Sequence, residues 1–222
     1  GSNARNYTLT LSTGDHFLQI ATDGGFLPQP TPLTSLTLSP AERAEIIIDF
    51  SHYNKDTAIA LCDDEALLLP FIVTEHNHFS HLPITLPSCT VTAQELALPV
   101  SKTFELYGMA DMAQINGKQF DPTRIDFTQK QGVTEVWEVY NKKDDMGGMI
   151  HPFHIHGTQV KLLARNGKPP VANECGYKDT IAIGVEERVR VAVRFMYKGI
   201  YMYHCHILEH EDNGMMGQIQ VI

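Results

Sequence analysis

The stretch from residue 188 to residue 195 reads RVRVAVRF, in which polar and apolar side chains alternate at almost every position. A period of two is typical of a β-strand, because successive side chains of a strand point to opposite faces. Similar short runs, rich in β-branched and aromatic residues and bounded by turn signals, recur along the chain, which predicts an all-β protein. We predict strands at residues 6–11, 16–21, 33–38, 43–50, 57–61, 67–73, 103–106, 133–140, 149–155, 159–165, 180–183, 188–195, 201–205 and 217–221.

Turn signals and prolines divide these runs. The sequences Asp23-Gly24-Gly25, Asn116-Gly117 and Asn166-Gly167 predict turns. Three prolines between residues 28 and 32 predict an irregular stretch, and three more between residues 82 and 101 predict a link between two β-domains. We place these domains at residues 1–98 and 99–222, and we predict a single helical turn at residues 208–212.

Composition excludes several classes of protein. The 222 residues include 17 Lys and Arg against 26 Asp and Glu, and the formal net charge of −9 argues against binding to nucleic acid or to an anionic membrane. No apolar run approaches the ~18 residues of a membrane span, and no signal-peptide pattern follows Gly1. We expect the natural chain to continue upstream of Gly1, which leaves the compartment open. The spacing of Cys62, Cys89 and Cys175 matches no disulfide framework, so we expect free thiols.

Six of the eleven histidines fall into two short clusters near the C-terminus. The first reads HPFHIHG over residues 151–157, and the second reads HCHILEH over residues 204–210. If the clusters lie on neighbouring strands, side chains two residues apart share a face. His151 and Cys205 then go to one face. The opposite face receives four imidazoles, those of His154, His156, His204 and His206.

The face that carries Cys205 predicts a copper site. His210 follows Cys205 by five residues, and Met215 follows His210 by five more. A thiolate, two imidazoles and a weak axial thioether are the ligands of a type 1 (blue) copper centre. Cys205 is also joined by peptide bonds to His204 and His206 on the other face. This adjacency predicts a route for single electrons between two metal sites.

Zinc and covalent catalysis are the rival interpretations of the clusters. Structural zinc usually takes paired cysteines, and this sequence has none near the histidines. Nucleophilic catalysis by a Cys–His pair would leave five further ligand-type residues unexplained. Both interpretations are therefore weaker than copper.

At these residues the chain resembles the multicopper oxidases, the family of laccases and bacterial cuprous oxidases. The two clusters are similar to that family's third and fourth copper-binding motifs, and the match is best with bacterial three-domain members. Residues 22–25 with Leu27-Pro28, and residues 42–45, resemble the second cupredoxin domain of such enzymes. Asn116-Gly117 and residues 157–159 resemble the third. The resemblance therefore covers nearly the whole chain and implies two cupredoxin-like Greek-key β-sandwich domains.

The resemblance also implies a role for each candidate residue. His151, Cys205 and His210 would hold type 1 copper, with Met215 as the axial ligand. His154 would bind type 2 copper, and the type 3 pair would take His156, His204 and His206. Glu211 stands where bacterial enzymes carry an acid that supplies protons to oxygen, although a solvated carboxylate explains it equally well.

The family's first two copper motifs, from an N-terminal cupredoxin domain, are missing from this sequence. His76-Asn77-His78, with His81 nearby, lacks the Trp and Gly of those motifs, so we interpret it as a surface stretch. The chain thus resembles the second and third domains of a three-domain oxidase. Its partners would be the N-terminal domain, dioxygen and a small reducing substrate such as a phenol, an aromatic amine or a metal ion.

We expect the isolated chain to bind type 1 copper but not to reduce dioxygen, because four imidazoles cannot serve three coppers. The main alternative is a blue-copper electron carrier or copper-binding module without catalysis of its own. A two-domain oxidase assembled as a trimer would need a His-x-His-Gly set in the first half, which is absent. A copper-free descendant of the fold is disfavoured because no ligand of the C-terminal clusters has been lost.

Overall fold

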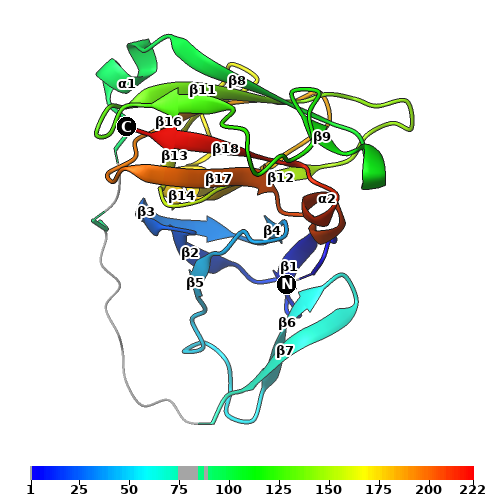
Figure 1. Ribbon diagram of the computed structural model, residues 1–222. Helices are drawn as coiled ribbons and strands as arrows, with labels where there is room; N and C mark the ends of the chain where they lie inside the picture. Colours follow the sequence, from blue (N-terminus) through cyan, green and yellow to red (C-terminus); the bar gives the residue numbers. More distant parts are fainter. Residues whose placement is uncertain (1, 75–84, 88–89) are drawn as a thin grey trace.

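The computed structural model describes residues 2–74, 85–87 and 90–222, and the strands of these residues form four sheets (Figure 1). Strands β1 to β7 form two sheets, which we call the N-terminal sheets. Strands β8 to β18 form the other two, the C-terminal sheets. The predicted all-β class is confirmed. Among the described residues, no helix is long and apolar enough to cross a membrane.

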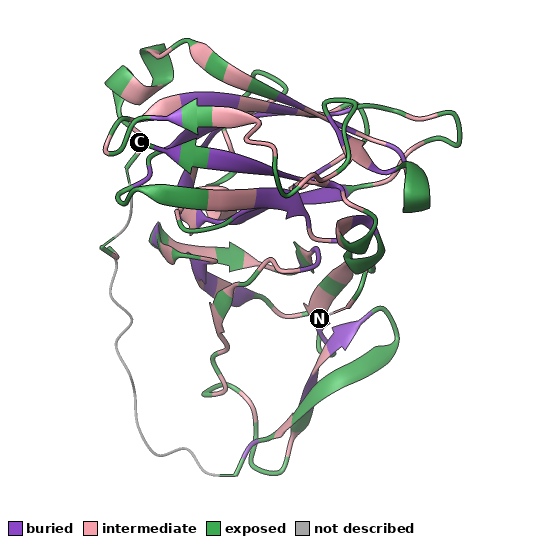
Figure 2. Cartoon of the chain, in the orientation of Figure 1, coloured by how far each residue is buried: buried purple, intermediate pink, exposed green. Residues whose placement is uncertain are grey.

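The N-terminal sheets have four and three strands. The first has the order β4-β1-β6-β7, with β4 at Leu36–Leu38, β1 at Tyr7–Leu11, β6 at Ala58–Asp63 and β7 at Ala66–Ile72. The second has the order β3-β2-β5, with β3 at Gly25–Leu33, β2 at Phe17–Thr22 and β5 at Glu45–Ile47. A small core that includes Leu11, Phe17 and Ile59 lies between them. Strand β7 is an edge strand and is exposed along most of its length (Figure 2).

The C-terminal sheets have six and five strands. The six-stranded sheet runs β14 (Tyr177–Lys178), β13 (Val160–Arg165), β16 (Arg188–Val193), β11 (Glu135–Asn141), β8 (Val100–Tyr107) and β9 (Gln114–Ile115). The five-stranded sheet runs β10 (Phe127–Gln129), β18 (Met216–Val221), β17 (Gly199–Cys205), β12 (His151–Ile155) and β15 (Thr180–Ile183). Short helical segments are α1 (Ala93–Ala97), η1 (Ala110–Met112), η2 (Ala172–Glu174) and α2 (Leu208–Asp212), the last at the predicted helical turn.

The main core lies between the two C-terminal sheets. Alternate residues of β11 and β16, such as Trp137 and Val191, meet alternate residues of β12 and β17, such as Phe153 and Tyr203. Cys205 belongs to this core and is fully buried. The alternation that marked these runs in the sequence therefore separates the core face of each strand from its other face.

The expectation of an irregular stretch at residues 28–32 was wrong. The stretch with three prolines is strand β3, which among the described residues pairs with β2 and lies at the edge of its sheet, where a proline without an N–H group is tolerated. The predicted link at residues 82–101 includes the short helix α1, because Thr92 and Glu95 form a reciprocal capping box, and strand β8 already begins at Val100. The division of the chain at residues 98 and 99 remains a proposal.

Two of the predicted turns form as expected. Asn116 and Gly117 have φ values of 54° and 70°, and Asn166 and Gly167 have φ values of 47° and 74°. Two successive residues with positive φ define the type I′ turn of a tight hairpin. The motif at residues 76–81 and Cys89 lie outside the described residues. Cys62 is a buried free thiol, and the Cys175 thiol donates a hydrogen bond to the Val171 carbonyl.

Candidate metal centre

The two histidine clusters meet because β12 and β17 are antiparallel neighbours. Phe153 lies opposite Cys205, and His154 lies opposite His204. Cys205 and Phe153 face the core, so His154 and His204 lie on the other face of the sheet. Gly157 then turns the chain with φ +70°, and a Cβ atom there would lie 2.2 Å from the ring of Tyr201. The final glycine of the first cluster is therefore required by the backbone.

On the core face, one sulfur and two ring nitrogens converge. The Cys205 Sγ atom lies 3.6 Å from His151 Nδ1 and 3.7 Å from His210 Nδ1. Helix α2 follows β17 and turns the chain back, which brings the His210 ring to 5.1 Å from the His151 ring, centroid to centroid. All three residues are buried.

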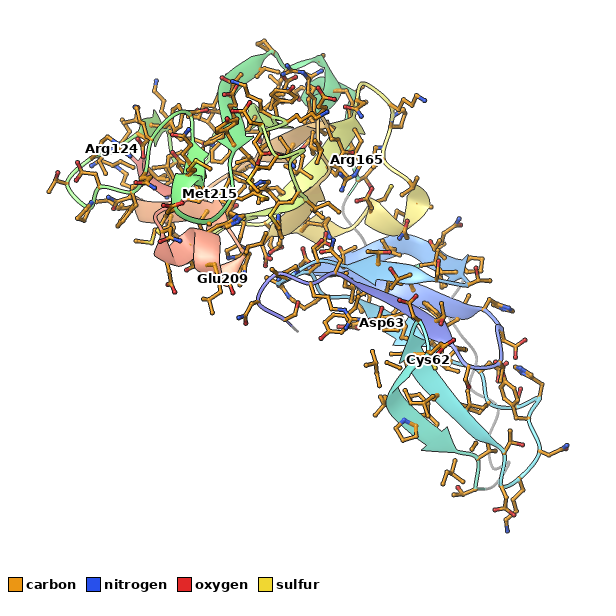
Figure 3. All side chains as sticks on the ribbon, turned by 90° about the vertical axis from the view of Figure 1, so that its right-hand side faces the viewer. Cys62, Asp63, Arg124, Arg165, Glu209 and Met215 are labelled. Carbon is orange, nitrogen blue, oxygen red and sulfur yellow. The ribbon has the colours of Figure 1, made fainter. Side chains whose placement is uncertain are left out.

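Met215 is tied to two members of this group by its backbone. Its carbonyl accepts a hydrogen bond from the Cys205 N–H at 3.1 Å, and its N–H donates to the His210 carbonyl at 2.9 Å. The residue is fully buried. Figure 3 labels Met215 in the C-terminal part of the chain, above Glu209 of α2. The four residues together resemble a type 1 copper site.

The distances around Cys205 fit a metal ion of that kind. Metal–ligand bonds of about 2.0 Å to an imidazole nitrogen and about 2.3 Å to a thiolate, placed about 120° apart, put nitrogen and sulfur about 3.7 Å apart. The observed distances of 3.6 and 3.7 Å match this value. The two sulfur–nitrogen distances thus already match those of a trigonal ligand set.

Burial sets the protonation of these ligands. Burial, and then the neighbouring His210, lowers the pKa of His151 to about 3, and burial lowers the pKa of His210 as well. Both imidazoles are therefore neutral at pH 7, with a lone pair available for a metal. Burial raises the pKa of the Cys205 thiol to about 12, so the thiolate that copper needs forms only when a cation replaces the proton.

On the other face, a second group contains only nitrogen. The ligand atoms of His154, His156 and His204 all lie within 4.8 Å of one another, and the Nε2 atoms of His156 and His204 are 2.9 Å apart. The His206 ring lies beside them, 5.4 Å from the His154 ring and 5.3 Å from the His204 ring. Burial lowers the pKa of His204 to about 4 and also lowers the pKa of His156, which keeps both rings neutral.

Hydrogen bonds orient two of these rings. The His154 Nδ1 atom lies 2.9 Å from the Asp179 carbonyl and 2.9 Å from Thr180 Oγ1. The His204 Nδ1 atom lies 2.9 Å from the Cys205 carbonyl. A carbonyl only accepts, so the proton of each neutral ring resides on Nδ1 and Nε2 is left to bind a metal. Glu211 lies at the edge of this group, with its Oε2 atom 3.5 Å from His204 Nδ1 and its side chain 30% exposed.

Nothing in the local sequence around Asp179 and Thr180 marks these two residues as part of the site. They stand 25 and 26 residues after His154: Asp179 joins β14 to β15, and Thr180 is the first residue of β15. Only the pairing of β15 with β12 brings them beside that ring. Although burial opposes ionisation of Asp179, hydrogen bonds from Arg43, His154, Gln159 and Thr180 hold its pKa well below the ordinary value.

Comparison with known proteins agrees with this geometry. A family model described as multicopper oxidase matches residues 93–222. The chain is 45% identical over 221 residues to the multicopper oxidase mco of Staphylococcus aureus, and this match covers 100% of the chain and 46% of that protein. It is 34% identical over 257 residues to the laccase of Bacillus subtilis, covering 99% of the chain and 49% of the laccase.

A solved structure gives the same result. The crystal structure of a laccase from Pediococcus acidilactici matches with a TM-score of 0.91 and 42% identity, and it covers 100% of this chain and 48% of that one. This chain therefore belongs to the multicopper oxidase family, and its fold matches the cupredoxin domains of that family. It spans about half the length of the curated relatives that it matches.

Proposed function

We propose that this chain is the C-terminal part of a multicopper oxidase that takes single electrons from phenols, aromatic amines or metal ions and reduces dioxygen to water. One observation carries the proposal. Cys205 holds its sulfur against two imidazole nitrogens on the core face, while the next residue back, His204, joins the nitrogen group on the opposite face. A single peptide unit thus connects a site for a one-electron metal with a second, nitrogen-lined site.

The residues have separate tasks in this proposal. His151, Cys205 and His210 would hold type 1 copper, with Met215 as a weak fourth ligand from its buried position beside them. His154 would serve type 2 copper, while His156, His204 and His206 would serve the type 3 pair. Bound copper would supply one-electron exchange at the first site and the reduction of dioxygen at the second.

Protons must reach dioxygen when it is reduced, and we propose that Glu211 delivers them. Its carboxylate is partly exposed and lies next to His204, so it can exchange protons with solvent on one side and face the nitrogen group on the other. Asp179 and Thr180 keep the His154 proton on Nδ1, away from the metal-binding nitrogen.

The nitrogen group is open on one side, which supports a missing partner. A cavity of about 830 Å³ lies against it and is lined by residues that include His154, His156, Asp179 and Arg194. The relatives are about twice as long as this chain. We propose that an N-terminal cupredoxin domain docks against this face and that its histidine side chains enter the cavity and complete the copper cluster.

Oxygen consumption tests the proposal. The copper-loaded chain, given a phenolic donor, should not consume dioxygen at a useful rate. Addition of a separately produced N-terminal domain should start consumption, and His154→Ala in this chain should abolish it again. Turnover by the chain alone, or a mixture of both parts that stays inactive although the two parts bind each other, would overturn the proposal.

A blue-copper electron carrier is the second candidate. It is favoured by the completeness of the Cys205 group within this chain, since that group needs no residue from elsewhere. Metal analysis separates the two candidates in the reconstituted protein. About one copper per chain supports the carrier, whereas additional copper held by the histidine group supports the oxidase.

A further inference from the structure

Asp179 lies between the N-terminal sheets and the histidine group. Its carboxylate accepts two hydrogen bonds from Arg43, from Nη1 to Oδ1 at 2.6 Å and from Nη2 to Oδ2 at 2.7 Å. Gln159 donates to Oδ2 at 2.9 Å, and Thr180 donates its hydroxyl proton to Oδ1 at 2.9 Å. A bidentate ion pair of this kind between arginine and aspartate fixes the plane of the carboxylate as well as its position.

The hydroxyl of Thr180 connects the fixed carboxylate of Asp179 to the ring of His154. Its only proton is given to Asp179, so toward His154 Nδ1, 2.9 Å away, the hydroxyl oxygen can act only as an acceptor. The Asp179 carbonyl accepts from the same Nδ1 atom at 2.9 Å. Two acceptors therefore face one ring nitrogen. That arrangement selects the tautomer with the proton on Nδ1.

Asp23 holds both partners of this contact in place. Its Oδ1 atom accepts from the Arg43 backbone N–H at 2.8 Å, and its Oδ2 atom accepts from the backbone N–H groups of Asp179 and Thr180, each at 3.2 Å. The Arg43 side chain also donates to the Asp23 carbonyl at 3.0 Å. The turn between β2 and β3 is thereby tied to the segment that supports His154.

We propose that Arg43, in the loop between β4 and β5 of the N-terminal sheets, is a positioning residue for the histidine group in the C-terminal sheets. Through Asp179 and Thr180 it keeps the His154 proton on Nδ1 and leaves Nε2 free for a metal. The inference rests on the proposed function for the role of His154 as a ligand. It adds that the N-terminal sheets, which lack copper ligands among their described residues, help to shape the metal site.

The test follows the His154 tautomer in the metal-free chain, so it does not depend on copper. Histidine is labelled with ¹⁵N, and long-range ¹H–¹⁵N spectra show which ring nitrogen carries the proton. Arg43→Gln removes both the positive charge and the bidentate hydrogen bonding of the guanidinium group. Arg43→Lys keeps the charge and removes the bidentate geometry. Glu42→Gln is the matched control, because it removes a charged contact between the same parts of the chain, the pair with Lys178, and leaves Lys178 paired with Asp23 and every hydrogen bond of Asp179 in place.

We expect a single Nδ1-protonated form of His154 in the unchanged chain and in Glu42→Gln. Arg43→Gln should show a mixture of tautomers, and Arg43→Lys an intermediate. In a Cys205→Ser background, Cu(II) binding to the histidine group, followed by electron paramagnetic resonance, should weaken about tenfold or more with Arg43→Gln. If Arg43→Gln does not fold, the same readings on Arg43→Lys decide.

An unaltered His154 tautomer in a folded Arg43 variant would overturn the inference, as would an equal change in Glu42→Gln. The proposed function fails separately. If the tautomer changes as expected but no form of the chain binds Cu(II) at the histidine group, Arg43 positions His154 and His154 is not a copper ligand.

Discussion

The low pKa of His151 makes the metal-free chain sensitive to acid. The ordinary pKa of histidine is 6.5, and in the fold burial together with His210 lowers the pKa of His151 to about 3. Between these values the unfolded chain binds a proton that the folded chain excludes. Stability therefore rises with pH in this window, and it is lost as the pH falls from about 6.5 toward 3.

The size of the effect follows from the two pKa values. Between pH 7 and pH 5, His151 alone should lower the free energy of unfolding by about 2 kcal/mol, and by pH 3 the loss should reach about 4 kcal/mol. His151→Gln removes the titrating group from the same buried place. The variant should therefore lose about 2 kcal/mol less than the unchanged chain over the same step, whatever other groups contribute.

Urea unfolding at pH 7, 6 and 5 measures this difference. Trp137, the one tryptophan of the chain, is buried in the core of the C-terminal sheets and reports their unfolding by fluorescence. His16→Gln, at an exposed position, controls for the loss of one histidine. An equal loss of stability with acid in the unchanged chain and in His151→Gln would refute the reasoning.

Three further outcomes follow from the site and the core. Copper binding at the Cys205 group at pH 7 should release about one proton, because burial raises the pKa of the Cys205 thiol to about 12 and copper replaces its proton. Calorimetry in buffers of different ionisation enthalpy measures this release, and copper binding to Cys205→Ser should release no proton. Met215→Leu should keep copper bound but raise its reduction potential in voltammetry, because a weak axial donor stabilises the oxidised ion; an unchanged potential would exclude Met215 as a ligand. Gly217→Ala should lower the free energy of unfolding by about 1–3 kcal/mol, since its Cβ would lie 2.2 Å from the Tyr203 hydroxyl, and a fully stable variant would contradict the packing.

Strand alternation made much of the site readable from the sequence. The runs around Phe153 and Tyr203 alternate, and this was enough to predict that His151 and Cys205 lie apart from His154 and His204, as they do in the structure. These ligands stand close together along the chain, so their faces could be predicted. Residues of one strand point to the same or opposite faces of it wherever that strand lies in the fold.

Contacts between distant segments were not predictable in the same way. Arg43 and Asp179 are 136 residues apart, and nothing in the local pattern of either segment points to the other. The strand β3 was missed because its prolines argue against a strand unless its place at the sheet edge is known. Both cases depend on which elements become neighbours, and periodicity does not carry that information.

The visible and paramagnetic spectra of the copper-loaded chain test the central claim most directly. We predict that one equivalent of the bound Cu(II) has the intense thiolate-to-copper absorption of a type 1 centre, and that this absorption is lost in Cys205→Ser while Trp137 fluorescence shows an intact fold. Copper that binds with equal stoichiometry and the same spectrum in both proteins would show that the Cys205 sulfur is not a ligand, and would contradict the account.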